Sequence, residues 1–186
     1  MKKISMSIVV VLMMLLALSL GVANAYKPMD SAHRMALAKG YVDGFFEALN
    51  KSATTGSLGL GNSRTADMLM LKQIAELAEH AGTYPNGYIG AIFYILFELH
   101  IDDEISCAIT VQEAKELKEL KDNAFMAGGG AMVEYLRDPL NSPLINKGKS
   151  PEAYELVKQI NADIFQTIPL IKKVYMKHPD RKHCQR

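Results

Sequence analysis

Acidic side chains at helical spacing are the first residues in this sequence that could do chemistry. Asp43 and Glu47 lie four residues apart in a stretch with helical periodicity, and Glu98 lies in a second, more apolar stretch. Paired carboxylates can serve as general acid and general base. No nucleophile in the sequence can be matched to these acids, so they do not by themselves predict an enzyme.

A histidine and three acids follow one another after the most apolar stretch, at His100, Asp102, Asp103 and Glu104. Four such groups could bind a cation. They lack the glycine and the alternating ligand spacing of a calcium loop. We therefore expect a polar turn between two helices here, and no metal site.

The C-terminus holds a second group of metal-ligating residue types, namely His178, Asp180, His183 and Cys184. Zinc or copper could be bound by such side chains. Their spacing matches no familiar site, and Cys184 is also a candidate for a disulfide. The pattern favours a frayed, basic C-terminus, so the sequence predicts neither a metal nor another cofactor.

Residues 51–64 are rich in glycine, serine and threonine and predict a loop. A loop of this length is often functional. It is not a phosphate-binding P-loop, because that motif needs a preceding strand and a Lys-Ser/Thr pair at the start of a helix. The sequence also has no Gly-x-Ser-x-Gly, HExxH or nucleotide-binding motif. We therefore expect a protein without catalytic activity.

The two cysteines, Cys107 and Cys184, predict a disulfide that ties the C-terminus to the middle of the chain. In an exported protein an even number of cysteines usually forms disulfides. The alternative is two free thiols. Their spacing excludes a CxxC redox motif, a haem-attachment motif and a four-cysteine zinc site.

The N-terminus has the pattern of a signal peptide. Lys2 and Lys3 precede an apolar segment, and Ala23-Asn24-Ala25 has the small-x-small form of a cleavage site. Cleavage after Ala25 would leave residues 26–186 as a single domain in the periplasm or secreted. The alternative is an uncleaved N-terminal membrane anchor.

The charge of the predicted mature chain argues against nucleic-acid binding. Of the 21 basic residues, two lie in the signal segment, which leaves 19 basic residues against 20 acidic ones. A nucleic-acid-binding protein would carry a basic face and a positive balance.

The fold is expected to be all-α, a compact bundle of six or seven helices around a buried central helix at about residues 86–100. That segment is apolar nearly all round, which is typical of an element inside a core. A buried strand is the rival interpretation, and the length of the segment favours a helix. The other predicted helices cover residues 30–50, 65–81, 110–122, 131–136, 150–166 and 170–177.

Several local signals mark where these helices begin, bend and end. Thr110 and Glu113 form a capping box. Gly128-Gly129-Gly130 predicts an end or bend, and Pro169 predicts a kink or a restart. Gly40 and Gly44 lie on one face of the first helix, where we expect the backbone of another helix to approach closely.

Three tyrosines beside glycines or prolines, Tyr41, Tyr84 and Tyr88, are candidates for a half-exposed protein-binding surface. Core packing with the hydroxyl at the surface is an equally good interpretation. With neighbouring residues they give the predicted partner-binding set: Tyr41, Asp43, Gly44, Ser57, Leu58, Tyr84 and Tyr88.

The stretch GYVDGFFEAL, a loop, the helix MLKQIAELAEHA and the segment YPNGYIGAIFYIL follow one another within residues 39–97. In this order, and with the sharpest matches at Gly40, Tyr41 and Gly44, residues 39–97 resemble the Rap/Tai-type immunity proteins of type VI secretion. The resemblance implies a periplasmic antidote that binds and blocks a peptidoglycan-cleaving amidase, as a homodimer.

The sequence therefore predicts a non-catalytic, exported helical binding protein, with an immunity-type inhibitor as its sharpest form. The alternative is a periplasmic helical protein that binds a small ligand or a metal. An inhibitor should show an exposed apolar patch beside residues 51–64. A ligand-binding protein should show an enclosed pocket lined by Tyr, Phe and Met.

Overall fold

The computed structural model describes residues 26–54, 63–79, 86–138, 151–182 and 184. These residues form helices and contain no strand, which confirms the all-α prediction. The elements are α2 (Ser31–Thr54), α3 (Ser63–Glu79), α4 (Asn86–Cys107), α5 (Val111–Ala124), a π-helical turn η1 (Phe125–Gly129), α6 (Gly130–Arg137) and α7 (Pro151–Tyr175). Because α5, η1 and α6 follow one another without a break, the described residues form five continuous helical runs, slightly fewer than predicted.

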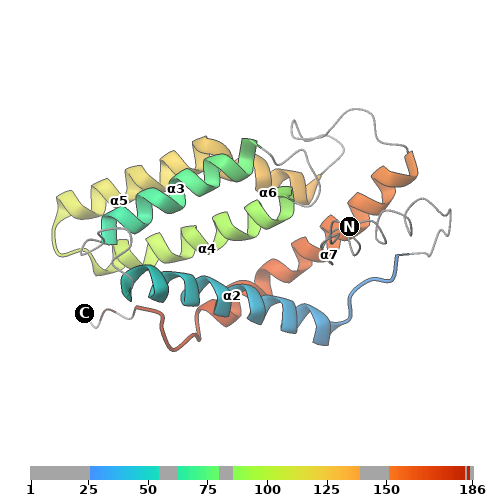
Figure 1. The fold of residues 1–186 in the computed structure, drawn as a ribbon, viewed down its shortest axis with the longest axis horizontal. Helices are drawn as coiled ribbons and strands as arrows, with labels where there is room; N and C mark the ends of the chain where they lie inside the picture. Colours follow the sequence, from blue (N-terminus) through green and yellow to red (C-terminus); the bar gives the residue numbers. More distant parts are fainter. Residues whose placement is uncertain (1–25, 55–62, 80–85, 139–150, 183, 185–186) are drawn as a thin grey trace, which may run out of the picture.

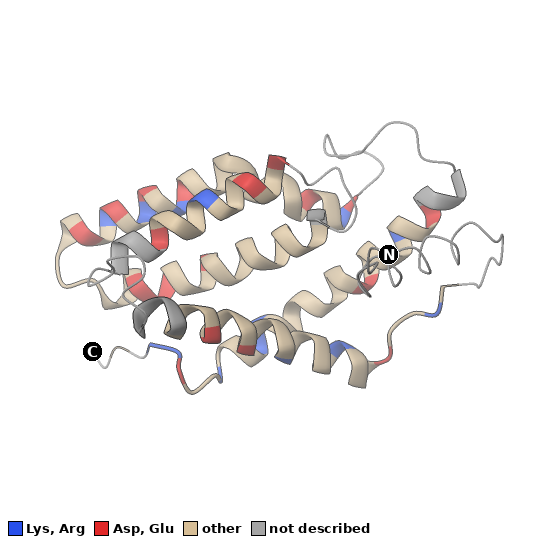
Figure 2. Cartoon of the chain, viewed as in Figure 1, with Lys and Arg blue, Asp and Glu red and all other residues tan. Residues whose placement is uncertain are grey.

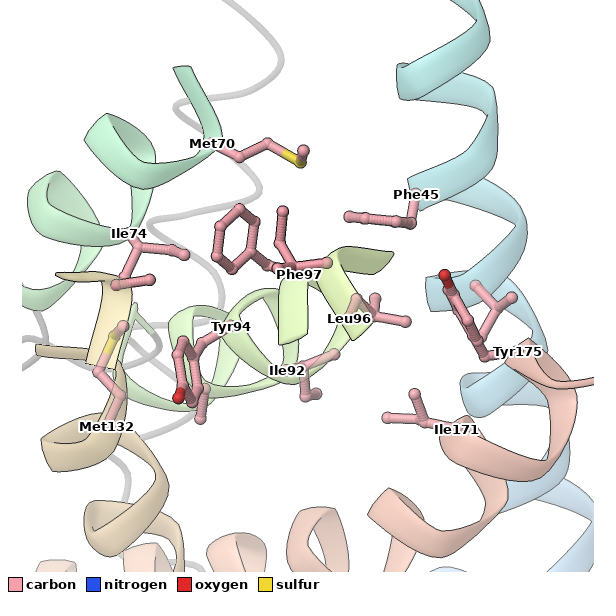
Figure 3. Close-up of a cluster of buried hydrophobic side chains, with 14 of the residues drawn as sticks. Phe45, Met70, Ile74, Ile92, Tyr94, Leu96, Phe97, Met132, Ile171 and Tyr175 are labelled. Atoms are coloured by element: carbon pink, nitrogen blue, oxygen red, sulfur yellow. The ribbon is translucent and has the colours of Figure 1, made fainter. Parts of the chain in front are cut away.

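Helix α4 is the centre of the molecule, as predicted. It contacts every other described element, with α3, α5 and α6 on one side and α2 and α7 on the other (Figure 1). Few charged residues occur along its middle (Figure 2). Its side chains Ile92, Leu96 and Phe97 are buried in the core that all the helices share (Figure 3). Full burial of such a side chain contributes about 1.5–3 kcal/mol to stability.

Helix α4 is also longer than predicted, and this corrects the expectation of a polar turn. It continues through His100 and the acids that follow, and it ends at Cys107. The apolar stripe continues at Ile101, which is fully buried, and at Ile105, one turn further on. That stripe keeps the segment helical against the core, so the polar residues occupy the remaining faces of the same helix.

Helix α2 confirms the predicted first helix and extends four residues beyond it, to Thr54. Asp30 caps its start by accepting a hydrogen bond from the backbone N–H of His33 at 2.8 Å. The prediction for Gly40 and Gly44 is wrong, since a Cβ added at either would meet no atom within 4 Å. Both glycines lie on the exposed face because the buried stripe runs along other residues of the helix. Lys51–Thr54, assigned to the loop by the sequence, belong to this helix, and residues 55–62 lie outside the described residues.

The start of α5 and its connection to α6 agree with the local predictions, except that the return bond of the capping box goes to Ile109 and not to Thr110. The Thr110 hydroxyl accepts a hydrogen bond from the Glu113 N–H at 3.1 Å, and the Glu113 carboxylate accepts one from the Ile109 N–H at 2.9 Å. Gly128 bends the chain with a φ of 122°, a left-handed conformation that favours glycine. On either side of this bend, both α5 and α6 pack against α4.

Helix α7 runs as one helix from Pro151 to Tyr175, so it does not restart at Pro169, and the alternative of a kink there stays a prediction. The Thr167 hydroxyl donates a hydrogen bond to the Asp163 carbonyl at 2.9 Å, in the turn before the proline. Buried side chains on both sides of Pro169, at Ile164 and Ile171, hold α7 against the core and α2. Tertiary packing therefore outweighs the local effect of proline. Among the described residues, none of the helices has the length and apolarity needed to cross a bilayer.

Candidate functional site

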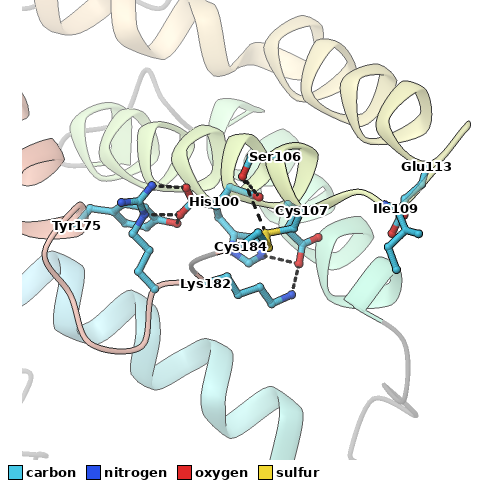
Figure 4. The surroundings of a disulfide bond; sticks show 11 residues. His100, Ser106, Cys107, Ile109, Glu113, Tyr175, Lys182 and Cys184 are labelled. Atoms are coloured by element: carbon cyan, nitrogen blue, oxygen red, sulfur yellow. Dashed lines mark hydrogen bonds and ion pairs between the residues drawn. A yellow bond between two sulfur atoms is a disulfide. The ribbon is translucent and has the colours of Figure 1, made fainter. Parts of the chain in front are cut away.

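A disulfide between Cys107 and Cys184 confirms the predicted pairing, with the two Cα atoms 5.3 Å apart. It joins the end of the central helix α4 to the segment that follows α7 (Figure 4). The bond closes a loop with a sequence separation of 77 residues, which strongly restricts the unfolded chain. The C-terminal segment is therefore held against the end of α4.

Ion pairs fix the same segment, so the prediction of a frayed C-terminus is wrong for its described residues, 178–182 and 184. Arg181 donates two hydrogen bonds to the Asp103 carboxylate, from Nε at 2.7 Å and from Nη2 at 2.6 Å. The Tyr175 hydroxyl donates to the same carboxylate at 3.1 Å. The bond to Asp103 raises the pKa of Arg181, and burial, followed by the charge of Asp103, raises the pKa of Tyr175. The ammonium of Lys182 also forms an ion pair with the Glu104 carboxylate.

The fixed C-terminal segment and α2 together enclose a groove of about 510 Å³, which we call the basic groove. Its lining comes from one face of α2, from the last turn of α7 and from the residues that follow. The lining residues are Met35, Lys39, Asp43, Lys173, Val174, Lys177, His178 and Pro179. On α2 the three residues repeat every four positions, which places them on one helical face.

His178 is held rigidly in this groove. Its imidazole stacks on the Phe46 ring, with the ring centroids 4.1 Å apart and the planes at 6°. Nδ1 accepts a hydrogen bond from the Asp180 N–H at 3.2 Å, which leaves Nε2 as the protonated nitrogen of the neutral ring. Nε2 lies 3.4 Å from Asp43 Oδ1. The groove therefore has a pre-formed wall in which Asp43 and His178 face each other.

The basic groove has an excess of positive charge. Three lysines, Lys39, Lys173 and Lys177, surround the single acid Asp43. Among the residues that the structure describes, none of these three ammonium groups is paired with a carboxylate. An uncompensated group of cations at an open surface attracts an acidic partner and favours its approach.

Of the predicted partner-binding residues that the structure describes, only Asp43 lines the basic groove. Tyr41 is half-buried on α2, and its burial raises the pKa of the phenol. Gly44 is exposed on α2, and Tyr88 is half-buried in the first turn of α4. The remaining predicted residues, Ser57, Leu58 and Tyr84, lie outside the described residues.

Asp43 and Glu98, two of the acids considered for catalysis, lie in different environments. Asp43 faces His178 in the basic groove, whereas Glu98 accepts a hydrogen bond from the Tyr94 hydroxyl at 2.8 Å and lies 4.0 Å from the ammonium of Lys121. Burial, followed by the bond to Glu98, raises the pKa of Tyr94. Asp43 and Glu98 therefore do not form an acid–base pair.

The predicted apolar patch beside residues 51–64 is not seen in the described residues. Met68 on α3 is half exposed, and the most exposed large apolar side chains, Ile109 and Val111, lie at the turn between α4 and α5. Sequence reasoning also missed the lysines of the basic groove. The spacing of Lys173 and Lys177, four residues apart near the end of a helix, was the available signal.

A comparison of the chain with protein-family models, with curated proteins and with solved structures finds no match. The resemblance of residues 39–97 to the Rap/Tai-type immunity proteins therefore stays a prediction. The site has to be interpreted from its own geometry.

Proposed function

We propose that this protein is an exported, non-catalytic binding protein, and that the basic groove receives an acidic segment of a protein partner. The observation that carries the proposal is the groove itself, with three lysines that have no carboxylate partner among the described residues. A wall fixed by a disulfide, a stacked histidine and partly buried ion pairs loses little conformational freedom on binding. The disulfide is compatible with export to an oxidising compartment.

The chemistry of the lining favours binding over catalysis. Asp43 and His178 form a pair of the kind that can activate a hydroxyl or a thiol. The groove lining contains no serine, threonine or cysteine that the pair could activate. The lysines around the pair are suited to recognising carboxylates as point charges.

The sharpest form of the proposal is an immunity protein that inhibits a cell-wall amidase. It rests on the order of elements in residues 39–97, where the structure has helix α2, helix α3 and the apolar helix α4 in the order that the resemblance implies. The basic groove uses the face of α2 that carries Asp43. A peptidoglycan hydrolase with an acidic rim around its active site is the partner that fits, and a homodimer is the assembly that the resemblance implies.

The test is capture of the partner by mature, disulfide-bonded protein, residues 26–186, followed by inhibition of its activity. The test variant reverses the charges of the groove with Lys39→Glu, Lys173→Glu and Lys177→Glu. The matched control changes Lys115 and Lys118 to Glu on the solvent-exposed face of α5, where acidic and basic residues alternate.

We expect stoichiometric capture and inhibition of a cell-wall hydrolase. The groove variant should bind at least about tenfold more weakly, because reversing charge in an interface replaces attraction by repulsion. The control should bind like the wild type. Equal binding by the groove variant would contradict the assignment of the groove, and capture of no hydrolase would contradict the immunity form.

A further inference from the structure

A second group of ionisable side chains lies outside the basic groove, between the first turns of α3 and the last turns of α4. It consists of Asp67 from α3 and of His100 and Glu104 from α4, one turn apart on the same helix. Their potential ligand atoms all lie within 4.8 Å of one another. We call these three residues the inner cluster.

Asp67 is the unusual member of the inner cluster. It is 1% exposed, and neither of its carboxylate oxygens has a hydrogen-bond donor among the described residues. It faces His100, whose Nε2 lies 3.5 Å from Asp67 Oδ1. Burying a carboxylate without hydrogen bonds is costly, so such a group in a native fold indicates a cation that it faces.

Protonated His100 does not provide that cation satisfactorily. Its Nε2 lies 3.5 Å from Asp67 and 3.8 Å from Glu104, and both distances exceed a normal N–H···O hydrogen bond. At these distances the His100 N–H makes no full hydrogen bond to either carboxylate. Lys182 is paired with Glu104, so among the described residues no lysine or arginine pairs with Asp67.

The same distances suit a metal ion placed between the three side chains. Ligand bonds of about 2.1 Å at a tetrahedral Zn²⁺ place neighbouring ligand atoms about 3.4 Å apart. The two measured separations of 3.5 and 3.8 Å are within a few tenths of that value. One imidazole and two carboxylates balance a divalent charge and leave a fourth position for water, and imidazole favours a transition metal over Ca²⁺ or Mg²⁺.

We propose that Asp67, His100 and Glu104 form a binding site for a divalent transition metal ion, with Zn²⁺ as the ion that their geometry fits. The side chain of His100 is 12% exposed, and that of Glu104 is 7% exposed, so the site is shielded but reachable. Figure 4 shows His100 and Lys182 beside the Cys107–Cys184 disulfide. The disulfide thus holds Lys182 next to Glu104, at the edge of the site.

The experiment is a calorimetric titration of Zn²⁺ into mature, disulfide-bonded protein that has been stripped with a chelator. Co²⁺ is titrated in parallel, since its visible absorption reports tetrahedral coordination. The ligand variants are Asp67→Asn, His100→Gln and Glu104→Gln. The matched control is Asp102→Asn, which changes a carboxylate on the same turn of α4 whose side chain is 53% exposed.

We expect one equivalent of Zn²⁺ to bind the wild type and the control. Each ligand variant should bind at least about tenfold more weakly, because even the loss of a residue that only supports a metal ligand costs about 10–100-fold. Absence of a one-equivalent site in the wild type would overturn the proposal. Unchanged affinity in the three ligand variants would overturn it as well.

A fourth variant, Lys182→Met, keeps the proposal testable if the ligand variants fold poorly. The Lys182 side chain is 56% exposed, so its replacement should leave the fold intact. Removing the ammonium beside Glu104 removes repulsion of a metal cation and frees the carboxylate. We expect Zn²⁺ to bind several-fold more tightly to this variant. Weaker or equal binding would contradict a metal at Glu104.

Discussion

Asp163 on α7 should be among the residues most important for stability. Its buried carboxylate accepts hydrogen bonds from the Tyr26 hydroxyl at 2.6 Å, the Met29 N–H at 2.8 Å and Arg34 Nη2 at 2.6 Å. These bonds tie the segment before α2 and the first turn of α2 to α7. Removing one partner of a buried ion pair costs about 3–5 kcal/mol. Because asparagine keeps one acceptor oxygen, we expect Asp163→Asn to lower the free energy of unfolding by about 2–4 kcal/mol.

The difference in unfolding free energy between the wild type and Asp163→Asn should also depend on pH, which gives a sharper test. Burial of Asp163 raises its pKa, but the hydrogen bonds from Tyr26, Met29 and Arg34 outweigh that effect and hold the pKa below its usual value. A carboxylate with a lowered pKa stabilises the fold above its unfolded pKa of about 3.9 and loses this contribution as the pH falls through the folded value. The advantage of the wild type over Asp163→Asn should therefore be constant near neutral pH and shrink below about pH 4.

Urea denaturation of the mature, disulfide-bonded chain at pH 7 and at pH 3 measures both effects. The control is Asp102→Asn, which removes one partner of a surface ion pair with Lys121 and should cost less than about 1 kcal/mol. A loss of unfolding free energy for Asp163→Asn no larger than that of the control would show that the Asp163 contacts do not stabilise the fold. A large difference that is unchanged at pH 3 would contradict the lowered pKa of Asp163.

Two sets of substitutions and one titration test other parts of the structure. Replacing both Cys107 and Cys184 by serine should lower the free energy of unfolding by up to about 4.5 kcal/mol, from the loop-entropy relation for a loop of 77 residues. Urea denaturation measures this loss, and a loss below about 1 kcal/mol would contradict a native disulfide. Gly128→Ala should cost about 1–3 kcal/mol because of its positive φ and a clash with Ala78, and unchanged thermal stability would contradict the bend. Spectrophotometric titration should show Tyr94 and Tyr175 ionising above the pH range of ordinary tyrosines, since burial raises both pKa values. Ionisation of all tyrosines in the ordinary range would contradict the burial of these two phenols.

The central helix could be predicted from the sequence because a helix that is buried on all sides has apolar residues on all its faces. The segment from Ile89 to Leu99 is apolar on nearly every face, and no other element of this fold needs that pattern. The end of the helix was harder to predict. His100 and the acids after it look like a turn in isolation, and only the contacts of Ile101 and Ile105 with the core show that they are helical.

The helix does not restart at Pro169, one of the two predicted outcomes, for a similar reason. The lost backbone hydrogen bond is a local cost, whereas the packing of Ile164, Ile171 and Tyr175 that compensates for it depends on distant residues. The open space at Gly40 and Gly44 has the same explanation, since the sequence shows which residues share a face but not what covers that face.

The two candidate sites depend on residues that are far apart in the sequence. Asp43 and His178 meet because the disulfide and the ion pairs of Asp103 guide the C-terminal segment back along α2. Asp67 reaches His100 only through the packing of α3 on α4. His100 and Glu104 lie four residues apart, which places them on one face if the segment is helical. Because a turn was predicted there, this spacing did not indicate a site.

Binding through the basic groove can be tested most directly by site-specific photo-crosslinking in the cells that make the protein. A photoreactive residue is placed at Lys39 in the basic groove, and in a second variant at Lys115 on the exposed face of α5. We expect a cross-link from position 39 to one acidic cell-wall hydrolase, and none to that protein from position 115. Cross-links to the same partner from position 115 but not from position 39, or no partner at either position, would contradict binding through the groove.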